Sequence, residues 1–261
     1  MEIAHKYINK PDFFGIGDKD GLGIHTEEYF HVHDCIIDLS GVPLSEMDEA
    51  FSPTWGAHGL IESCLIRGAG KLVLCGCGDE QTPGSEAAKE IGKGVTFKRC
   101  VLEDFGRRGP EVQGGMVVVL SQCLVRNWGV PSRFDTRAFG AWAHDGGVIS
   151  AQHTIFHQSD FCPSLWCWLR DHIGHFGQAI NERGFFRALF HKDAWLSGYR
   201  RGLTAGPKGF VFANLCHVTD SRIVIDTPYK PMNEIEYATL LNELTVMVDR
   251  LVDELVRGKD A

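Results

Sequence analysis

Two groups of histidines are the residues in this chain with the clearest potential for chemistry. Imidazole binds transition metals and exchanges protons near neutral pH. Twelve histidines occur in 261 residues. One group lies in residues 25–34, where three histidines and three carboxylates share ten positions. The other runs from His144 to His175. Each group is a candidate metal site or acid–base site.

His31 and His33 in the first group are separated by a single valine. On a strand, alternate side chains point to the same face, so both rings would face one metal ion. Asp34 or Glu28 would complete a set of nitrogen and oxygen ligands. The alternative is a polar, solvent-exposed segment that precedes the first strand.

The second group begins with His144-Asp145-Gly146-Gly147. This sequence suggests a histidine general base beside a carboxylate on a flexible turn. Adjacent side chains on an extended chain point apart, so the sequence does not require the two to touch. The glycine pair is equally typical of a tight turn.

His153 and His157 follow at i, i+4 spacing, which on a helix would place both rings on one face with Asp160. Two structural histidines on an amphipathic helix would give the same pattern. The glutamate of the H-E-x-x-H metalloprotease motif is missing, because Thr154 follows His153.

Composition and charge narrow the classes of function. The hydrophobic fraction of 44% and the charged fraction of 23% are typical of a soluble globular protein. The net charge is −8 with no basic stripe, which argues against a nucleic-acid partner. No apolar run of membrane-spanning length occurs, and Met1–Lys10 lacks the apolar stretch of a secretory signal. Nine cysteines, mostly inside apolar runs, indicate small buried side chains in a reducing cytoplasm.

Short apolar runs alternate with helix-like stretches in residues 35–125. This order predicts an α/β fold with a mostly parallel sheet and flanking helices, a Rossmann-like core. We expect one domain of residues 1–261, made of an irregular lead-in over 1–34, the core over 35–125 and an aromatic-rich elaboration over 126–261, without an internal repeat. The predicted strands of the core are Cys35–Leu39, Lys71–Cys75, Val95–Leu102 and Met116–Val125, and its predicted helices are Trp55–Gly68 and Ser85–Ile91.

The C-terminal elaboration ends in a strongly patterned helix, Glu234–Val256. Asn233 and Glu236 form a capping box at its start. Its apolar stripe is wide enough to pack on a sheet, so we expect any homo-oligomer to use the Trp-rich region 127–209 instead. Before it we predict a helix at Ser164–Asn181 and strands at Gly209–Leu215 and Arg222–Ile225.

Ligands of parallel sheets bind beyond the carboxyl ends of the strands. The segment Cys75–Glu80 directly follows a predicted strand and carries two glycines and two acids. Asp79 and Glu80 are therefore candidates for metal binding and for acid–base catalysis.

The span Gly59–Leu102 resembles part of the creatininase-like amidohydrolases. Residues 60–68, a helix-like stretch ending in glycine, precede Lys71–Glu80 and an Ala-rich stretch from Ser85, as in that family. His144-Asp-Gly-Gly-Val148 also resembles its His-Gly-Gly segment, although the family's Asn-Gly-His turn is absent. The resemblance implies that the family's metal-binding His falls on Cys77 and its metal-binding Glu on Asp79.

Together these features lead us to expect a metal-dependent hydrolase of a small amide-like or cyclic C–N substrate. The cofactor would be a divalent metal (Zn, Mn or Fe), and the partner a small molecule. The alternative is a non-enzymatic α/β regulatory or assembly subunit with structural histidines. The expected metal ligands are His31, His33 and Asp79, with Glu28 and Cys77 as further candidates, and the expected catalytic residues are His144, Asp145 and Glu80.

Overall fold

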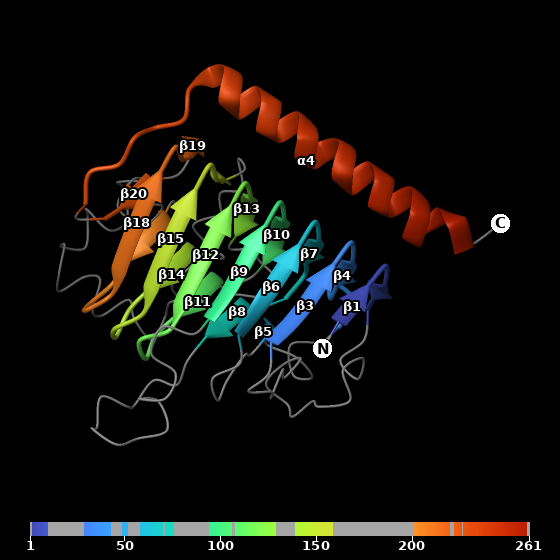
Figure 1. Cartoon of the computed structure of the whole chain (residues 1–261), viewed down its shortest axis with the longest axis horizontal. Helices are drawn as coiled ribbons and strands as arrows, with labels where there is room; N and C mark the ends of the chain where they lie inside the picture. Colours follow the sequence, from blue (N-terminus) through green and yellow to red (C-terminus); the bar gives the residue numbers. More distant parts are fainter. Residues whose placement is uncertain are drawn as a thin grey trace, which may run out of the picture.

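The chain winds through three parallel sheets in turn, one strand in each, and repeats this course coil after coil (Figure 1). The computed structural model describes residues 2–9, 29–42, 49–51, 58–69, 71–75, 94–105, 108–128, 139–158, 201–219, 222–225 and 227–259. Two sheets have seven strands and the third has six. All strand pairs within this part of the chain are parallel. The described residues form a parallel β-solenoid with a long helix on its flank.

The sheets are called A, B and C in the order in which each coil visits them. Sheet A contains β1 (Glu2–Ala4), β3 (Tyr29–His33), β6 (His58–Glu62), β9 (Gly94–Lys98), β12 (Val117–Ser121), β15 (Val148–Gln152) and β18 (Phe210–Asn214). Sheet B contains β2 (Tyr7–Ile8), β4 (Ile36–Asp38), β7 (Leu65–Arg67), β10 (Val101–Phe105), β13 (Leu124–Trp128), β16 (Ile155–His157) and β19 (His217–Thr219). Sheet C contains β5 (Glu49–Phe51), β8 (Lys71–Cys75), β11 (Arg108–Val112), β14 (Phe139–Ala143), β17 (Arg201–Ala205) and β20 (Arg222–Val224).

A two-residue corner joins sheet A to sheet B in every coil. Its first residue has a positive φ, which turns the chain sharply enough for the next strand to enter the neighbouring sheet. Its second residue is a buried cysteine in five coils and a buried threonine in one, whereas Lys6 of the first coil is exposed. The first residues are His5, Asp34, Ser63, Arg99, Gln122, His153 and Leu215, with φ between 45° and 55°.

The corner cysteines form a buried column along the solenoid. Each thiol from Cys64 onward donates to a carbonyl of the preceding coil, as Cys100 does to Ile61 O at 3.3 Å. Thr154 replaces cysteine in one coil and donates in the same way, to Leu120 O at 3.2 Å. The column therefore satisfies its own polar atoms inside an apolar core. Its cysteines, all free, are Cys35, Cys64, Cys100, Cys123 and Cys216.

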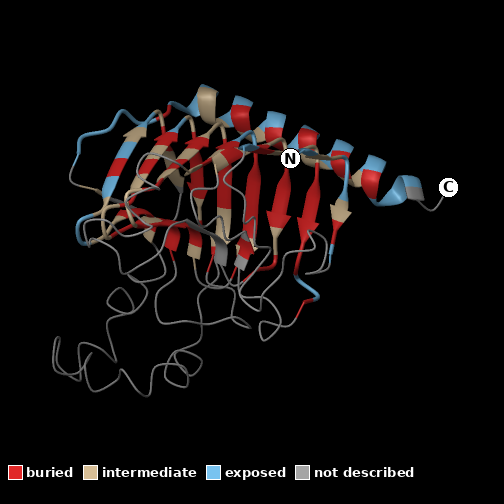
Figure 2. Cartoon of the chain, turned by 60° about the horizontal axis from the view of Figure 1, so that its bottom comes forward, coloured by how far each residue is buried: buried red, intermediate tan, exposed pale blue. Residues whose placement is uncertain are grey.

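The core fills the space enclosed by the three sheets, where strand residues are mostly buried (Figure 2). Alternate residues of the sheet A strands face inward, as Phe30 and Val32 do on β3. Because the strands are in register, equivalent residues of successive coils stack on one another. The outward residues of sheet A remain at least partly exposed, so any chemistry on this sheet belongs to its outer face.

The helix α4 (Glu234–Leu255) lies along the solenoid and covers the outer face of sheet B (Figure 1). Its 22 residues span about 33 Å at the usual rise per residue. Asn233 caps its start and Glu236 completes the capping box. The single-turn 3-10 helix η4 (Arg257–Lys259) follows it. The buried stripe of α4 packs on one apolar residue from each of five coils. The stripe is Leu240, Leu244, Met247, Leu251 and Leu255, and the residues beneath it are Ile36, Leu65, Val101, Leu124 and Ile155.

A ladder of alternating charge runs beside this apolar row on sheet B. Arg67 bonds Asp38 at 2.7 Å, and Arg126 bonds Glu103 at 2.7 Å. In-register strands bring equivalent side chains close together, so like charges would repel and alternating charges attract. The ladder adds coil-to-coil contacts on sheet B next to the row that the helix covers, and its two carboxylates, Asp38 and Glu103, are buried.

The prediction of an α/β fold with mostly parallel strands is confirmed, and so is the final helix with its capping box and its packing on a sheet. Strands predicted near residues 36–38, 71–75, 210–214 and 222–224 are also confirmed. The predicted Rossmann-like core was a single sheet, whereas the chain coils through three sheets. The long helix among the described residues lies along the stack of coils and does not connect two strands of a sheet.

Several local predictions were wrong for a common reason. Residues 58–67 form two strands instead of a helix, because a positive-φ residue, Ser63, breaks the run at a corner. The single strands predicted at 95–102 and 116–125 are likewise each split by a corner. His153 lies at a corner before β16, so it shares no helix face with His157. The lead-in contains β1, β2 and β3.

The prediction of no internal repeat was also wrong, because the course through sheets A, B and C recurs along the chain. The repeat is hard to see in the sequence because its length varies. The corner cysteines recur after 29, 36 and 23 residues at Cys35, Cys64, Cys100 and Cys123, so no fixed period marks the coils. The predicted helices at 85–91 and 164–181 lie outside the described residues.

Candidate functional site

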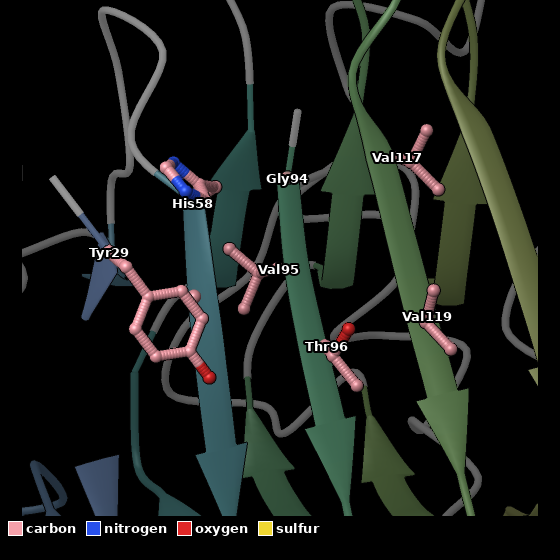
Figure 3. Close-up of a pocket in the computed structure, with 8 residues that line it drawn as sticks. Tyr29, His58, Gly94, Val95, Thr96, Val117 and Val119 are labelled. Carbon is pink, nitrogen blue, oxygen red and sulfur yellow. The ribbon is translucent and has the colours of Figure 1, made fainter. Parts of the chain in front are cut away.

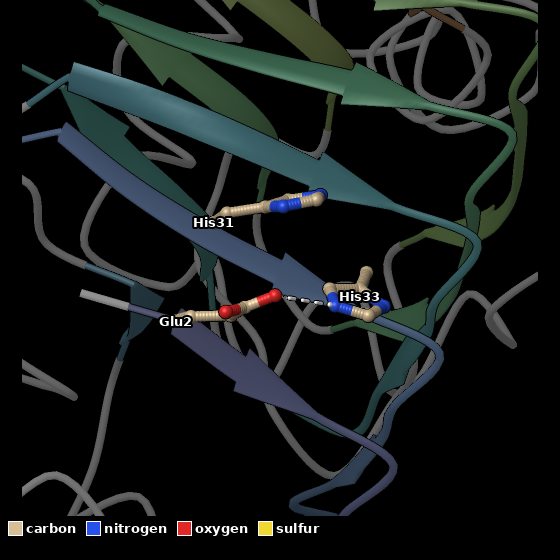
Figure 4. A group of neighbouring side chains, drawn as sticks. All are labelled: Glu2, His31 and His33. Atoms are coloured by element: carbon tan, nitrogen blue, oxygen red, sulfur yellow. Dashed lines mark hydrogen bonds and ion pairs between the residues drawn. The ribbon is translucent and has the colours of Figure 1, made fainter.

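His31 and His33 lie on the outer face of β3, as the alternation predicted, and Glu2 of β1 lies beside them (Figure 4). Glu2 and His31 are register partners in the parallel β1–β3 pair. The two imidazole rings have their centroids 4.6 Å apart. Because β1 pairs with β3, the carboxylate of Glu2 lies next to the imidazoles of His31 and His33.

The three side chains have the chemistry and the spacing of a metal site. Each offers one ligand atom, and these atoms lie within 4.8 Å of one another. His33 Nε2 and Glu2 Oε1 are 3.3 Å apart. Two ligands of one tetrahedral zinc, at bonds of about 2.0–2.1 Å, are separated by about 3.3 Å. The His₂Glu set therefore fits a divalent transition metal and leaves a fourth position open.

Asp34 orients His33 from the other side of its ring. His33 Nδ1 lies 2.9 Å from Asp34 Oδ2, and Arg250 of α4 donates to Asp34 Oδ1 at 2.7 Å. A carboxylate on the far nitrogen is the usual support of a metal-binding histidine, because it directs the other nitrogen to the metal. The hydrogen bond that His33 donates to the Asp34 carboxylate raises the pKa of His33. Burial raises the pKa of Asp34, but the hydrogen bonds from His33 and Arg250 outweigh it and leave that pKa below its ordinary value.

Further polar groups surround the cluster on neighbouring strands. His31 Nε2 is buried and has no hydrogen-bond partner within the described structure. Its nearest carboxylate oxygen, Glu62 Oε2, is 3.7 Å away, and Lys98 holds Glu62 at 2.8 Å. His5, His33 and Asp34 form a second, overlapping group whose ligand atoms are equally close.

A hollow of about 300 Å³ opens on the same outer face of sheet A (Figure 3). Tyr29 forms one wall and belongs to the same strand face as His31. The hollow crosses β6 and β9 and ends at β12. Its lining is Tyr29, His58, Gly59, Gly94, Val95, Thr96, Val117 and Val119.

The second group of charged side chains lies at the end of the sheet C strands. His144 Nε2 is 2.9 Å from Glu111 Oε1, and His144 Nδ1 is 2.7 Å from Asp145 Oδ2. Asp145 and Gly146 both have positive φ, and Gly147 N donates to His144 O at 2.8 Å. This tight turn folds Asp145 back onto its neighbour, so the two side chains touch although they are adjacent.

Trp142 and Arg108 complete this group. The ring of Trp142 stacks on that of His144 with centroids 3.9 Å apart, and the Arg108 guanidinium lies 4.4 Å from the Trp142 ring. Arg108 also pairs with Glu111. Burial lowers the pKa of His144, but the hydrogen bonds to Glu111 and Asp145 outweigh it and raise that pKa above its ordinary value. His144 is therefore held between two carboxylates that favour its protonated form.

The two groups are separate. His144 precedes β15, and β15 lies four strands from β3 in sheet A, or about 19 Å at the usual strand spacing. The expectation that His144 serves as the base at the His31–His33 metal is not met by this arrangement. Glu28, Cys77, Asp79, Glu80 and Asp160 lie outside the described residues.

Sequence reasoning missed Glu2, Glu111 and Arg108. Glu2 becomes a neighbour of His31 only through the β1–β3 pairing, which joins positions 29 residues apart. Glu111 and His144 are 33 residues apart and meet because successive coils stack. The recurring corner cysteine is a sequence feature that aligns the coils, but its irregular spacing conceals it.

The chain was compared with family models, with curated proteins and with solved structures, and no match was found in any of the three. No helix in the described part of the chain is long and apolar enough to cross a membrane.

Proposed function

We propose that the protein is a metal-dependent hydrolase whose metal is held by Glu2, His31 and His33. The observation that carries this proposal is the convergence of their ligand atoms within 4.8 Å on an open sheet face. Three protein ligands with an open fourth position are typical of catalytic rather than structural zinc sites.

The residues around the metal ligands have distinct tasks in this proposal. Glu2, His31 and His33 would hold the divalent metal, which would supply Lewis-acid chemistry when bound. In the chain without metal His33 Nε2 donates to Glu2 Oε1 at 3.3 Å; with a metal bound, Asp34 would keep the remaining proton of His33 on Nδ1 and leave the Nε2 lone pair for the metal. Glu62, held by Lys98, lies 3.7 Å from His31 Nε2 and is the group that accepts a proton in this proposal.

The substrate in this proposal is a small amide-like or cyclic C–N compound. This class is the expectation from the sequence, although residues 60–68, which were expected to match a helix of the creatininase-like amidohydrolases, belong to two strands here. The outer face of sheet A is partly exposed, and no described residue covers His31 and His33 as a lid. A small molecule would therefore have room to bind beside these two histidines.

Hydrolysis of hydantoin, creatinine and acetamide, measured with and without chelator, tests the proposal. We expect turnover of at least one of them, its loss with EDTA and its recovery with zinc or manganese. A His31→Ala, His33→Ala double variant should be inactive, and His157→Asn, which changes a half-buried histidine on sheet B, should retain activity. Turnover that survives chelator and the double variant would overturn the proposal.

The second candidate is a non-enzymatic regulatory or assembly subunit. The observation in its favour is that both ring nitrogens of His144 are already bonded to carboxylates, which is a structural role. Stoichiometric metal together with no hydrolysis of any tested amide or cyclic compound would favour this candidate.

A further inference from the structure

His33 has a carboxylate beside each of its two ring nitrogens. On one side, His33 Nε2 lies 3.3 Å from Glu2 Oε1, within the metal site proposed above (Figure 4). On the other side, His33 Nδ1 lies 2.9 Å from Asp34 Oδ2. Either nitrogen of an imidazole can bind a metal ion. The ring of His33 can therefore serve two sites at once, one on each side.

His5 brings a second imidazole to the Asp34 side of this ring. His5 and Asp34 are the corner residues that follow β1 and β3, and both have positive φ. The backbone N–H of His5 donates to His33 O at 3.3 Å, which holds the two residues side by side. Their rings have centroids 5.7 Å apart, with the planes 80° from parallel. One ligand atom each from His5, His33 and Asp34 lies within 4.8 Å of the other two.

The chemistry of this corner group matches that of the first metal site. Two imidazole nitrogens and one carboxylate oxygen form a set that suits zinc and copper(II). His5 is exposed, and the side chains of His33 and Asp34 are partly exposed, so ions in solution can reach the group.

We propose that His5, Asp34 and Nδ1 of His33 bind a second divalent transition-metal ion, so that the ring of His33 bridges two ions. The proton on Nδ1 passes to water when the second ion binds, and each ring nitrogen then holds one ion. With metal–nitrogen bonds of about 2.0–2.1 Å, the ions are about 6 Å apart across the ring. This inference rests on the metal site proposed above, because the first ion occupies Nε2 of the same ring.

The second ion should bind more weakly than the first. It displaces a proton that the Asp34 carboxylate stabilises on Nδ1. It also meets the positive charge of Arg250, whose guanidinium lies 2.7 Å from Asp34 Oδ1. We therefore expect the second ion in a titration with excess metal and its loss on dialysis.

Copper(II) titration of the chelator-treated full chain, followed by electron paramagnetic resonance (EPR), tests the proposal. Two copper(II) ions joined by one imidazolate ring couple magnetically and lose much of their signal at low temperature. We expect the EPR signal to rise as the first ion binds and to fall as the second ion binds. Two unconnected ions would instead give a signal that keeps rising.

The variant His5→Asn removes a ligand of the second ion alone. Asparagine tolerates the positive φ of this corner, so the backbone should remain intact. We expect the second ion to bind about ten-fold or more weakly, the first ion to stay, and the fall in signal to disappear. The matched control is His153→Asn, which changes a histidine at the equivalent corner of another coil and should behave as the wild type.

Three results would overturn the bridged pair. These are a signal that keeps rising with the second ion, a His5→Asn chain that behaves as the wild type, and a chain that binds a single ion in excess copper. In the third case the site of Glu2, His31 and His33 still stands. A chain that binds no copper would overturn both the bridged pair and the metal site proposed above.

Discussion

The Arg250 guanidinium on α4 lies 2.7 Å from Asp34 Oδ1, although the two residues are 216 positions apart. Asp34 in turn bonds His33. The C-terminal helix is thereby connected to the candidate metal site at the first coils. The helix does more than cover sheet B, since Arg250 holds the carboxylate that bonds His33, a candidate metal ligand.

The first prediction concerns this connection. Asp34→Asn should weaken zinc binding about 10–100-fold, the usual cost of losing the carboxylate behind a metal-binding histidine. Asparagine tolerates the positive φ of this position, so the corner should remain intact. Zinc affinity is measured by competition with a chromophoric chelator.

Arg250 offers a second test of the same contact. Arg250→Ala should weaken zinc binding in the same direction as Asp34→Asn, and Arg250→Lys should restore part of the affinity by keeping a cation near Asp34. Unchanged zinc affinity in both Asp34→Asn and Arg250→Ala would show that the contact plays no part in metal binding.

The second prediction concerns the packing of α4. Leu244 is buried against sheet B, so Leu244→Ala should lower the free energy of unfolding by about 2–5 kcal/mol. The control is Val246, which lies on the same helix but is 59% exposed. Val246→Ala should change the free energy of unfolding by less than about 0.5 kcal/mol. Urea unfolding followed by circular dichroism gives both values. Equal effects of the two substitutions would mean that the helix does not pack as described.

The C-terminal helix shows which parts of the fold can be predicted from the sequence. Its apolar stripe and its cap from Asn233 are local signals, and both were predicted correctly. Likewise, the placement of His31 and His33 on one strand face needed only their alternation. Parallel pairing followed from short apolar runs, because such runs are typical of strands buried in parallel sheets.

The coils could not be predicted because their defining signal is the backbone at the corners. Ser63 and Arg99 adopt positive φ, which neither residue type favours, so the sequence around them resembles one continuous element. The variable lengths between corners then hide the repeat. Contacts across coils, such as Glu111 with His144, follow from the stacking and were invisible for the same reason.

The third prediction concerns pH. The pKa of His144 is raised in the folded chain, so its bonds stabilise the fold fully below its ordinary value of 6.5. This contribution is lost as the pH rises through the raised value. The difference in unfolding free energy between wild type and His144→Gln should therefore be largest below pH 6.5 and shrink above it. His33 is present in both proteins and cancels. A difference that grows with pH would contradict this assignment.

The fourth prediction concerns the cysteine column. Burial raises the pKa of Cys100 and Cys123, and five of the nine cysteines of the chain are buried free thiols. These five should not react with a thiol reagent in the native protein and should react in urea. Thr154→Cys would extend the column and add one more unreactive thiol. More than four reactive thiols in the folded wild type would show that the column is accessible.

The central claim is that Glu2, His31 and His33 together hold one divalent metal. Elemental analysis of the purified chain, dialysed against zinc and then against metal-free buffer, tests it most directly. We predict about one zinc per chain in the wild type and in the control His157→Asn, and about a ten-fold lower content in Glu2→Ala, His31→Ala and His33→Ala. A wild-type chain that retains no metal, or three variants that all retain one equivalent, would contradict the account.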